Sequence, residues 1–121
     1  MRFSFIDALP KEWHTQIQEY LDGKRQKFDV KITLTGTDFQ KSVWEAMMKI
    51  PYGSVMTYGE IAAVIGRPQA ARAVGNACNA NKYPIVVPCH RVVASNGIGG
   101  YGYGGLDIKR ALLKIEGITN L

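Results

Sequence analysis

The sequence predicts a single, mainly α-helical domain with a short β wing. Three observations support this fold class. The 121 residues are enough for one hydrophobic core and too few for two of ordinary size. Thr37 and Thr57 each open a capping-box pattern, which marks the start of a helix. A glycine-rich segment, 97–105, follows a β-branched pair and precedes a last helical pattern, which is typical of a short strand and its loop.

The composition is that of a globular protein. Hydrophobic residues make up 46% and charged residues 21% of the chain, so extended disorder is excluded. No apolar run approaches the roughly 20 residues that span a bilayer, and the first residues lack the cleavage site of a secretory signal. Cys78 and Cys89 are too few for a disulfide framework. We therefore expect reduced thiols in a cytoplasmic protein, nucleoid-associated if prokaryotic, without membrane contact.

The first 36 residues predict one helix and one extended segment. Pro10 suits a first helical turn and Gly23 suits the residue after a helix, so we expect a helix over 10–22. Residues 28–35 alternate apolar and polar side chains, which predicts either a half-buried strand or an extended linker. The inward face of the helix carries Trp13, Ile17 and Leu21.

The next segment predicts a longer helix that ends in a turn. Thr37 with Gln40 three residues later begins a helix over 39–50, and the turn follows at 51–53. The inward residues of this helix are Phe39, Val43 and Met47.

A helix-turn-helix is expected after that turn. Thr57 with Glu60 begins a short helix that ends at Gly66, and Pro68 begins a second helix that runs to about Asn79. The second helix of such a motif enters the major groove of DNA. Here it carries mostly small residues, with one long side chain, that of Arg72, near its start. The alternative is an ordinary helix hairpin that packs closely through those small residues.

The C-terminal third predicts a strand, a wing and a helix. Residues 92–93 suit a short strand, 96–97 a turn, and 97–105 a flexible loop that forms the wing. Asp107 is expected to cap a last helix, which ends at Gly117. The inward residues of that helix are Ile108, Ala111, Leu112 and Ile115.

The charge distribution favours a polyanionic partner. The net charge is +5, and no acidic residue lies between Glu60 and Asp107. A surface without carboxylates suits phosphate groups, because each carboxylate would repel them. The alternative is a mildly basic protein with a chance gap in its acidic residues. The basic residues of this acid-free stretch are Arg67, Arg72, Lys82 and Arg91.

Cys89 is the candidate nucleophile. The thiolate is the reactive form, and His90 and Arg91 beside it would favour that form. The alternative, an inert buried thiol, is our interpretation of Cys78. Because neighbouring residues of an extended chain point apart, His90 needs a tight turn or a bridging water to reach the sulfur.

Glu116 lies at the C-terminus of the last predicted helix, where the helix dipole disfavours a negative charge. It is therefore expected to have a partner such as His90, and the alternative is a solvated glutamate. The cysteines and histidines lack the spacing of a zinc site, so we expect neither a metal nor a cofactor. The residues considered as ligands are His14, Cys78, Cys89 and His90.

Four motifs resemble a known family. They are MTYGEIA at 56–62, AARAVGNACNAN at 70–81, PCHRVV at 88–93 and KRALLKIEG at 109–117. Their order and distances resemble those of the O6-alkylguanine-DNA alkyltransferases, also called methylated-DNA–protein-cysteine methyltransferases, from about Gln16 to the C-terminus. The resemblance implies a winged-helix DNA-binding domain that flips the damaged nucleotide out of the duplex and transfers its alkyl group irreversibly to its own cysteine.

The resemblance implies a role for each matching residue of the active site. Cys89 is the acceptor, His90 removes the thiol proton through a water molecule, and Glu116 orients and polarises His90. Asn81 ties the turn before the active-site segment. Tyr58 crowds the target phosphate and protonates N3 of the leaving guanine.

The resemblance also implies a DNA-binding surface and a lesion pocket. Arg72 matches the arginine finger that fills the stack after flipping, while Arg67 and Ser95 match phosphate-contacting positions. Tyr58, and Arg91 of the acid-free stretch, complete the expected DNA-binding set. Tyr103, in the loop over the pocket, stands where many relatives have a small or basic residue, which bears on the alkyl groups that fit. The expected pocket residues are Val92, Tyr101 and Tyr103.

Relatives usually carry an N-terminal α/β domain, of which residues 1–36 would be a remnant, with 37–121 as the winged-helix domain. We predict a monomer that repairs O6-alkylguanine in double-stranded DNA in a single turnover, with O4-alkylthymine as a further candidate substrate. One alternative is a non-catalytic alkyltransferase-like lesion sensor, in which another residue replaces the acceptor cysteine. A winged-helix regulator is the other alternative, and it leaves the Cys89 motif and Glu116 unexplained.

Overall fold

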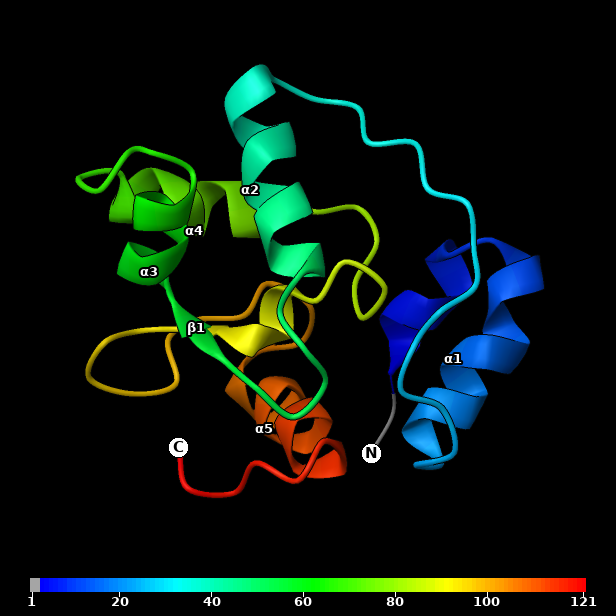
Figure 1. Cartoon of the computed structure of the whole chain (residues 1–121). Helices are drawn as coiled ribbons and strands as arrows, with labels where there is room; N and C mark the ends of the chain where they lie inside the picture. The colour runs from blue at the N-terminus through cyan, green and yellow to red at the C-terminus, as the bar shows by residue number, and fades with distance from the viewer. Residues whose placement is uncertain (1–2) are drawn as a thin grey trace.

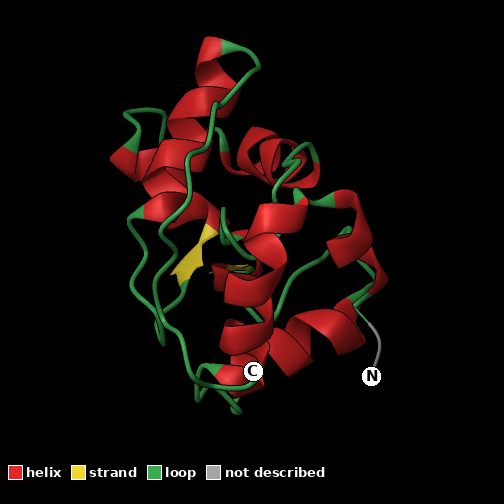
Figure 2. Ribbon diagram, turned by 90° about the vertical axis from the view of Figure 1, so that its right-hand side faces the viewer, coloured by secondary structure: helices red, strands yellow, loops and turns green. Residues whose placement is uncertain are grey.

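The computed structural model describes residues 3–121, and within them it shows a mainly helical chain with a two-stranded sheet, as the sequence predicts. In Figure 1, α2, α3 and α4 form one group, α1 lies on the opposite side, and α5 lies at the bottom of the view. Figure 2 shows how little of the chain is strand. The elements are η1 (Ser4–Ala8), η2 (Lys11–Trp13), α1 (His14–Leu21), α2 (Asp38–Met48), β1 (Met56–Thr57), α3 (Tyr58–Val64), α4 (Ala71–Asn79), η3 (Cys89–Arg91), β2 (Val92–Val93) and α5 (Leu106–Ile115).

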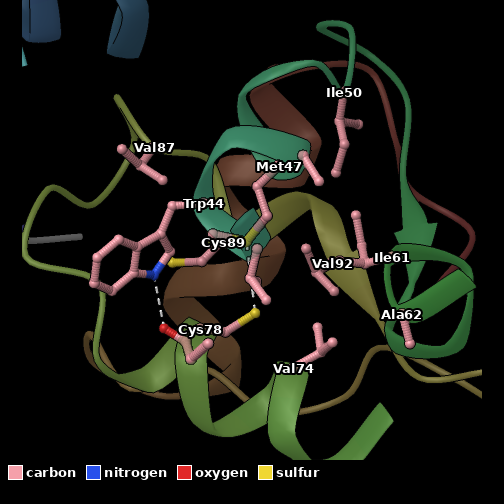
Figure 3. Close-up of a cluster of buried hydrophobic side chains, with 13 residues drawn as sticks. Trp44, Met47, Ile50, Ile61, Ala62, Val74, Cys78, Val87, Cys89 and Val92 are labelled. Atoms are coloured by element: carbon pink, nitrogen blue, oxygen red, sulfur yellow. Dashed lines mark hydrogen bonds between the residues drawn. The ribbon is translucent and has the colours of Figure 1, made fainter. Parts of the chain in front are cut away.

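Two clusters of buried apolar side chains hold these elements together. The first lies between α2, α3 and α4 and includes Cys89 and Val92 (Figure 3). Trp44 of this cluster donates from Nε1 to the carbonyl oxygen of Ala77 at 2.9 Å, which ties α2 to α4. The second cluster joins the N-terminal segment to α5 and to the residues just before Cys89. Its buried members are Leu9, Trp13, Ile17, Tyr20, Ile85, Val86, Ile108 and Leu112. The Cys89 segment therefore lies between the two clusters.

Both predicted capping boxes are present. Thr37 Oγ1 accepts the backbone N–H of Gln40 at 3.0 Å, and Gln40 Oε1 accepts the backbone N–H of Thr37 at 3.0 Å. Thr57 and Glu60 make the same reciprocal pair at 3.0 and 2.9 Å. Each box satisfies two backbone donors that a helix start would otherwise leave unpaired, which is why α2 and α3 begin where the sequence predicts.

The helix-turn-helix forms, but its second helix starts later than expected. Gly66 ends α3 with φ at +78°, and the N–H of Arg67 bonds to the carbonyl of Ala62 at 2.8 Å. Pro68 was expected in the first turn of the second helix. It lies instead in a β-turn closed by the N–H of Ala70 on the carbonyl of Arg67 at 2.9 Å. Proline suits the second position of such a turn as well as a helix start, and the turn prevails here.

The structure corrects one N-terminal prediction and decides between the two alternatives of another. The expected helix over 10–22 is a 3-10 turn, η2, followed by α1. Trp13 and Ile17 are buried as predicted, but Tyr20 rather than Leu21 is the third buried side chain of this segment. The segment 28–35 keeps its alternation of half-buried and exposed side chains but pairs with no strand within residues 3–121, so the second alternative, an extended linker, is the one observed. The chain runs along it from α1 to the start of α2 (Figure 1).

The predicted strand at 92–93 forms, and its partner strand comes from the residues just before α3. β1 and β2 pair in parallel, with Met56 opposite Val92 and Thr57 opposite Val93. An antiparallel bridge joins Ala94 to Gly97, and the loop after it is irregular up to α5. The prediction that Asp107 caps α5 is wrong, because Gly105 is the N-cap residue. Asp107 lies in the first turn, where its negative charge stabilises the helix by its interaction with the helix dipole.

None of the helices in residues 3–121 combines the length and hydrophobicity needed to span a bilayer. Cys78 and Cys89 are free thiols, as predicted. The division of the chain at residues 36 and 37 stays a prediction.

Replacing Thr37 with alanine should lower the free energy of unfolding by about 1 kcal/mol, because α2 loses its N-cap oxygen. Urea unfolding followed by circular dichroism measures this. Thr33→Ala is the matched control, since Thr33 is exposed on the extended linker. Equal stability of the two variants would contradict the role of the cap.

Candidate active site around Cys89

Asn81 holds the turn that leads to Cys89. Its Oδ1 accepts the N–H of Tyr83 at 2.9 Å, and its Nδ2 donates to the carbonyl of Val87 at 2.9 Å. The same Nδ2 lies 3.4 Å from Cys89 Sγ. Asn81 is 3% exposed, so these contacts are made in the interior. Asn81 thus contacts both the turn, as the resemblance implies, and the thiol of Cys89.

This turn contains a strained residue. Ile85 has φ of +72°, a left-handed conformation that a β-branched side chain rarely adopts. The Ile85 side chain is 1% exposed in the second cluster. Burial of the Ile85 side chain and the Asn81 hydrogen bonds to Tyr83 and Val87 together hold the backbone in this conformation. The turn leads directly to Cys89, the first residue of η3.

The Glu116 carboxylate is the centre of a buried hydrogen-bond network. Oε2 lies 2.7 Å from His90 Nε2 and accepts the hydroxyl of Tyr20 at 2.6 Å. Oε1 accepts the N–H of Gly53 at 3.0 Å and Nε of Arg91 at 2.8 Å. The prediction that Glu116 has His90 as a partner is confirmed, and the alternative of a solvated glutamate is wrong, because its side chain has no exposed surface.

The network leaves His90 as a neutral base. Burial alone would raise the pKa of Glu116, but hydrogen bonds from His90, Arg91 and Tyr20 outweigh it and lower the pKa to about 2. Burial lowers the pKa of His90 despite the neighbouring carboxylate. An ionised carboxylate only accepts, so Nε2 carries the imidazole proton. Nδ1 is buried without a hydrogen-bond partner among residues 3–121 and is the atom able to take a proton.

Cys89 rests as a thiol. Burial raises its pKa, and the hydrogen bond from Asn81 and the charge of Lys109 only partly offset this. The expectation that His90 and Arg91 would favour the thiolate is therefore wrong, since Arg91 binds Glu116 instead. Among the described residues Cys89 and His90 share no side-chain hydrogen bond, so proton transfer between them needs an intermediary, as the sequence analysis anticipated.

Arg91 does not belong to a DNA-binding surface. It is 7% exposed, and its guanidinium bonds to both Glu116 oxygens at 2.8 and 3.1 Å and to the carbonyl of Ile50 at 2.9 Å. A phosphate cannot reach a guanidinium that is buried against a carboxylate. The prediction that Arg91 binds DNA is wrong, because the position of a residue in the chain does not show whether its side chain points to the interior or to the surface.

The expected pocket residues gather around Cys89. Val92 is fully buried in the same cluster, and Tyr101 and Tyr103 pack against it from the loop (Figure 3 shows Cys89 and Val92). The Tyr101 hydroxyl is buried without a partner among the described residues. Phe5 of η1 packs on Tyr103 with ring centroids 5.6 Å apart, so the N-terminal segment supports this side of the pocket.

Tyr58 lies at the start of α3, close to the loop. A Cβ at Gly99 would lie 2.9 Å from the Tyr58 hydroxyl, and the φ of Gly99 is +75°, so only glycine lets the loop pass there. Burial raises the pKa of Tyr58, which keeps the phenol protonated. By contrast, the three remaining DNA-binding candidates are exposed: Arg67, Arg72 and Ser95.

Two residues of the site escaped the sequence analysis, Tyr20 and Lys109. Lys109 is fully buried on α5, where Nζ donates to the carbonyls of Val92 at 2.7 Å and Gly100 at 2.8 Å. Burial lowers its pKa to about 8. A signal existed for both. Tyr20 is seven residues after Trp13, and Lys109 seven before Glu116, spacings that place each pair on one helical face.

The geometry is that of a buried thiol next to a buried, neutral imidazole, in a chain that also carries a helix-turn-helix with exposed basic side chains. Residues 38–118 match the family model for the DNA-binding domain of 6-O-methylguanine DNA methyltransferase. The chain belongs to this family. A methylated-DNA–protein-cysteine methyltransferase of Methanosarcina acetivorans is 55% identical over 108 residues, which cover 88% of this chain and 69% of the relative.

Two solved structures are similar to this chain. That of Mycobacterium tuberculosis OGT in complex with DNA is 52% identical, with a TM-score of 0.82, and the match covers 85% of this chain and 64% of that one. That of S. pombe Atl1, in complex with damaged DNA containing O6-carboxymethylguanine, is 37% identical with a TM-score of 0.62. This match covers 70% of this chain and 81% of that one.

Acid should destabilise the protein through Glu116. Its pKa in the folded chain, about 2, lies below the ordinary 4.5, so the unfolded chain takes up the proton first as the pH falls. Up to about 3 kcal/mol of stability is present above pH 4.5 and lost between pH 4.5 and 2. Urea unfolding across this range measures the loss. Glu116→Gln should remove this part of the slope and Glu45→Gln, on the exposed face of α2, should keep it. An unchanged slope in Glu116→Gln would contradict the assignment.

Proposed function

We propose that this protein repairs DNA by transferring the alkyl group of O6-alkylguanine irreversibly to Cys89, once per molecule. One observation carries the proposal: Cys89 is a buried thiol 3.4 Å from the Asn81 amide, and the residue after it is a neutral histidine oriented by a buried carboxylate. A regulator that only binds DNA has no use for this arrangement. The names of the relatives, which describe methyl transfer from DNA to a protein cysteine, support the same activity.

The transfer is an in-line displacement at the alkyl carbon. His90 Nδ1 receives the Cys89 proton through a water molecule, and the sulfur forms a bond to the alkyl carbon as the carbon–O6 bond breaks. Tyr58 donates its phenol proton to N3 of the departing guanine, which leaves as a neutral base. The raised pKa of Tyr58 supports this role, since the phenol is protonated before the reaction. The thioether that forms has no reverse path, so each molecule acts once.

The DNA-binding surface comprises the exposed residues of the helix-turn-helix and the turn after β2. Arg72 is the second residue of α4, and the residues around it are small, so the backbone can approach a groove closely. We assign Arg72 to the gap left by the flipped nucleotide, and Arg67 and Ser95 to phosphate contacts. The structures of two similar proteins were solved with DNA, which supports double-stranded DNA as the partner.

Three further statements belong to the proposal. The protein acts as a monomer, in the cytoplasm, where Cys89 stays reduced. O4-alkylthymine is a further candidate substrate. The alternative function is a lesion sensor that binds without transfer, in which another residue replaces the acceptor cysteine. The presence of Cys89 at the acceptor position favours transfer.

Cys89→Ser should abolish alkyl transfer and keep lesion binding, because a hydroxyl is a far weaker nucleophile than a thiolate and the DNA-binding surface is intact. Mass spectrometry of the intact protein after incubation with O6-methylguanine DNA measures the transfer. The wild type and Cys78→Ser should each gain one methyl group. Tight binding without mass gain in the wild type would instead support the sensor, and a methyl group on Cys78 would refute the site.

Arg72→Ala should slow transfer from duplex DNA at least about tenfold and leave transfer from a free alkylated base nearly unchanged, because flipping costs a few kcal/mol and only the duplex needs it. Single-turnover rates on both substrates measure this. Arg110→Ala is the matched control, since Arg110 is exposed on α5, outside the helix-turn-helix. Equal losses on the two substrates would show that Arg72 has another role.

A further inference from the structure

We propose that Tyr20 is a positioning residue of the transfer reaction: the N-terminal segment supplies a hydroxyl that holds the Glu116 carboxylate and so governs how readily His90 accepts the thiol proton. The inference rests on the proposed function, in which His90 is the base. It gives α1 a part in the chemistry, although α1 lies on the opposite side of the structure from the helix-turn-helix (Figure 1).

The contacts of Tyr20 are short and wholly internal. Its side chain is fully buried, and its hydroxyl donates to Glu116 Oε2 at 2.6 Å. The hydroxyl oxygen of Tyr20 also lies 3.2 Å from His90 Nε2. Three aromatic rings fix the direction of the phenol. Their centroids lie 5.8 to 6.2 Å from that of Tyr20, and they belong to Phe28, Tyr52 and His90.

The position of the hydroxyl determines its chemical effect. Oε2 is the oxygen that accepts the imidazole N–H, and it also accepts Nη2 of Arg91 at 3.1 Å. Gly53 and Nε of Arg91 bond to Oε1. The Tyr20 hydroxyl, at 2.6 Å the shortest of the three contacts on Oε2, withdraws further negative charge from the atom that stabilises a protonated imidazole. Without the Tyr20 hydroxyl, Oε2 would hold the imidazolium more strongly. His90 would then be protonated at higher pH, and less of it would be free to take the proton from Cys89.

The other groups around His90 act differently. Arg91 of η3 and Lys109 of α5 carry positive charges that oppose its protonation, and Glu116 favours it. Cys89 is next to it in the chain, and Tyr52, in the turn after α2, donates to the carbonyl of Ile115 at 3.0 Å. Burial raises the pKa of Tyr20 far above its ordinary value, so Tyr20 contributes a hydrogen bond and no charge.

Tyr20→Phe tests this with the ring retained. The rate of methyl transfer to Cys89 from a duplex containing O6-methylguanine is measured in single turnover across the pH range in which the protein is folded. The midpoint of the acid limb should rise by about one pH unit, since a hydrogen bond to a charged group has about that effect. Tyr52→Phe is the matched control, which loses a hydroxyl that bonds to a backbone carbonyl, and its midpoint should stay at the wild-type value.

An unchanged midpoint in a Tyr20→Phe variant that melts at a lower temperature would overturn the proposal, because Tyr20 would then only stabilise the fold. If Tyr20→Phe fails to fold, 3-fluorotyrosine at position 20 keeps the hydroxyl and makes it a stronger donor. The midpoint should then fall, and a constant midpoint would overturn the proposal.

The proposed function can fail separately. If the wild type transfers no methyl group, the imidazole of His90 is titrated directly by NMR in the wild type and in Tyr20→Phe. A higher midpoint in the variant supports the effect of Tyr20 on His90, and equal midpoints overturn it.

Discussion

The buried carboxylate of Glu116 is the interaction on which the rest of the structure depends. A charge without exposed side-chain surface is tolerable only when donors surround it, because burial removes its hydration. The donors come from α1, from the turn after α2 and from η3, which are far apart in the chain. They are Tyr20, Gly53, His90 and Arg91. One negative charge therefore fixes the N-terminal segment, the nucleophile segment and the last helix against one another.

This requirement separates the chemistry from DNA binding. Arg91 compensates Glu116 in the interior, so the basic side chains left for phosphate are the exposed ones, of which Arg67 and Arg72 belong to the helix-turn-helix. Burial keeps Cys89 as a thiol and His90 neutral, and the pair becomes reactive only through proton transfer. A thiol that is not ionised at rest is also protected from other electrophiles.

The nucleophile segment is held in place by polar contacts as much as by packing. Asn81 clamps the turn that contains the strained Ile85, and Lys109 satisfies the carbonyl of Val92 just beyond Cys89. A short irregular segment between two apolar clusters has backbone groups that no helix or sheet can satisfy, so side chains must do it. This explains a fully buried lysine in a protein whose partner is proposed to be an anion.

The sequence by itself determined the features that depend on near neighbours. Both capping boxes and the glycine that ends α3 involve residues within five positions of each other, so their physics is complete in a short stretch. The motifs around Cys89 also predicted Cys89 as the nucleophile and His90 as its base, the roles that the proposed function keeps. Only the tertiary structure decided the roles of Tyr20, Arg91 and Lys109. Their partners, the Glu116 carboxylate for Tyr20 and Arg91 and the Val92 carbonyl for Lys109, lie 96, 25 and 17 residues away. Which partner each side chain meets depends on how the clusters pack, which no local pattern encodes.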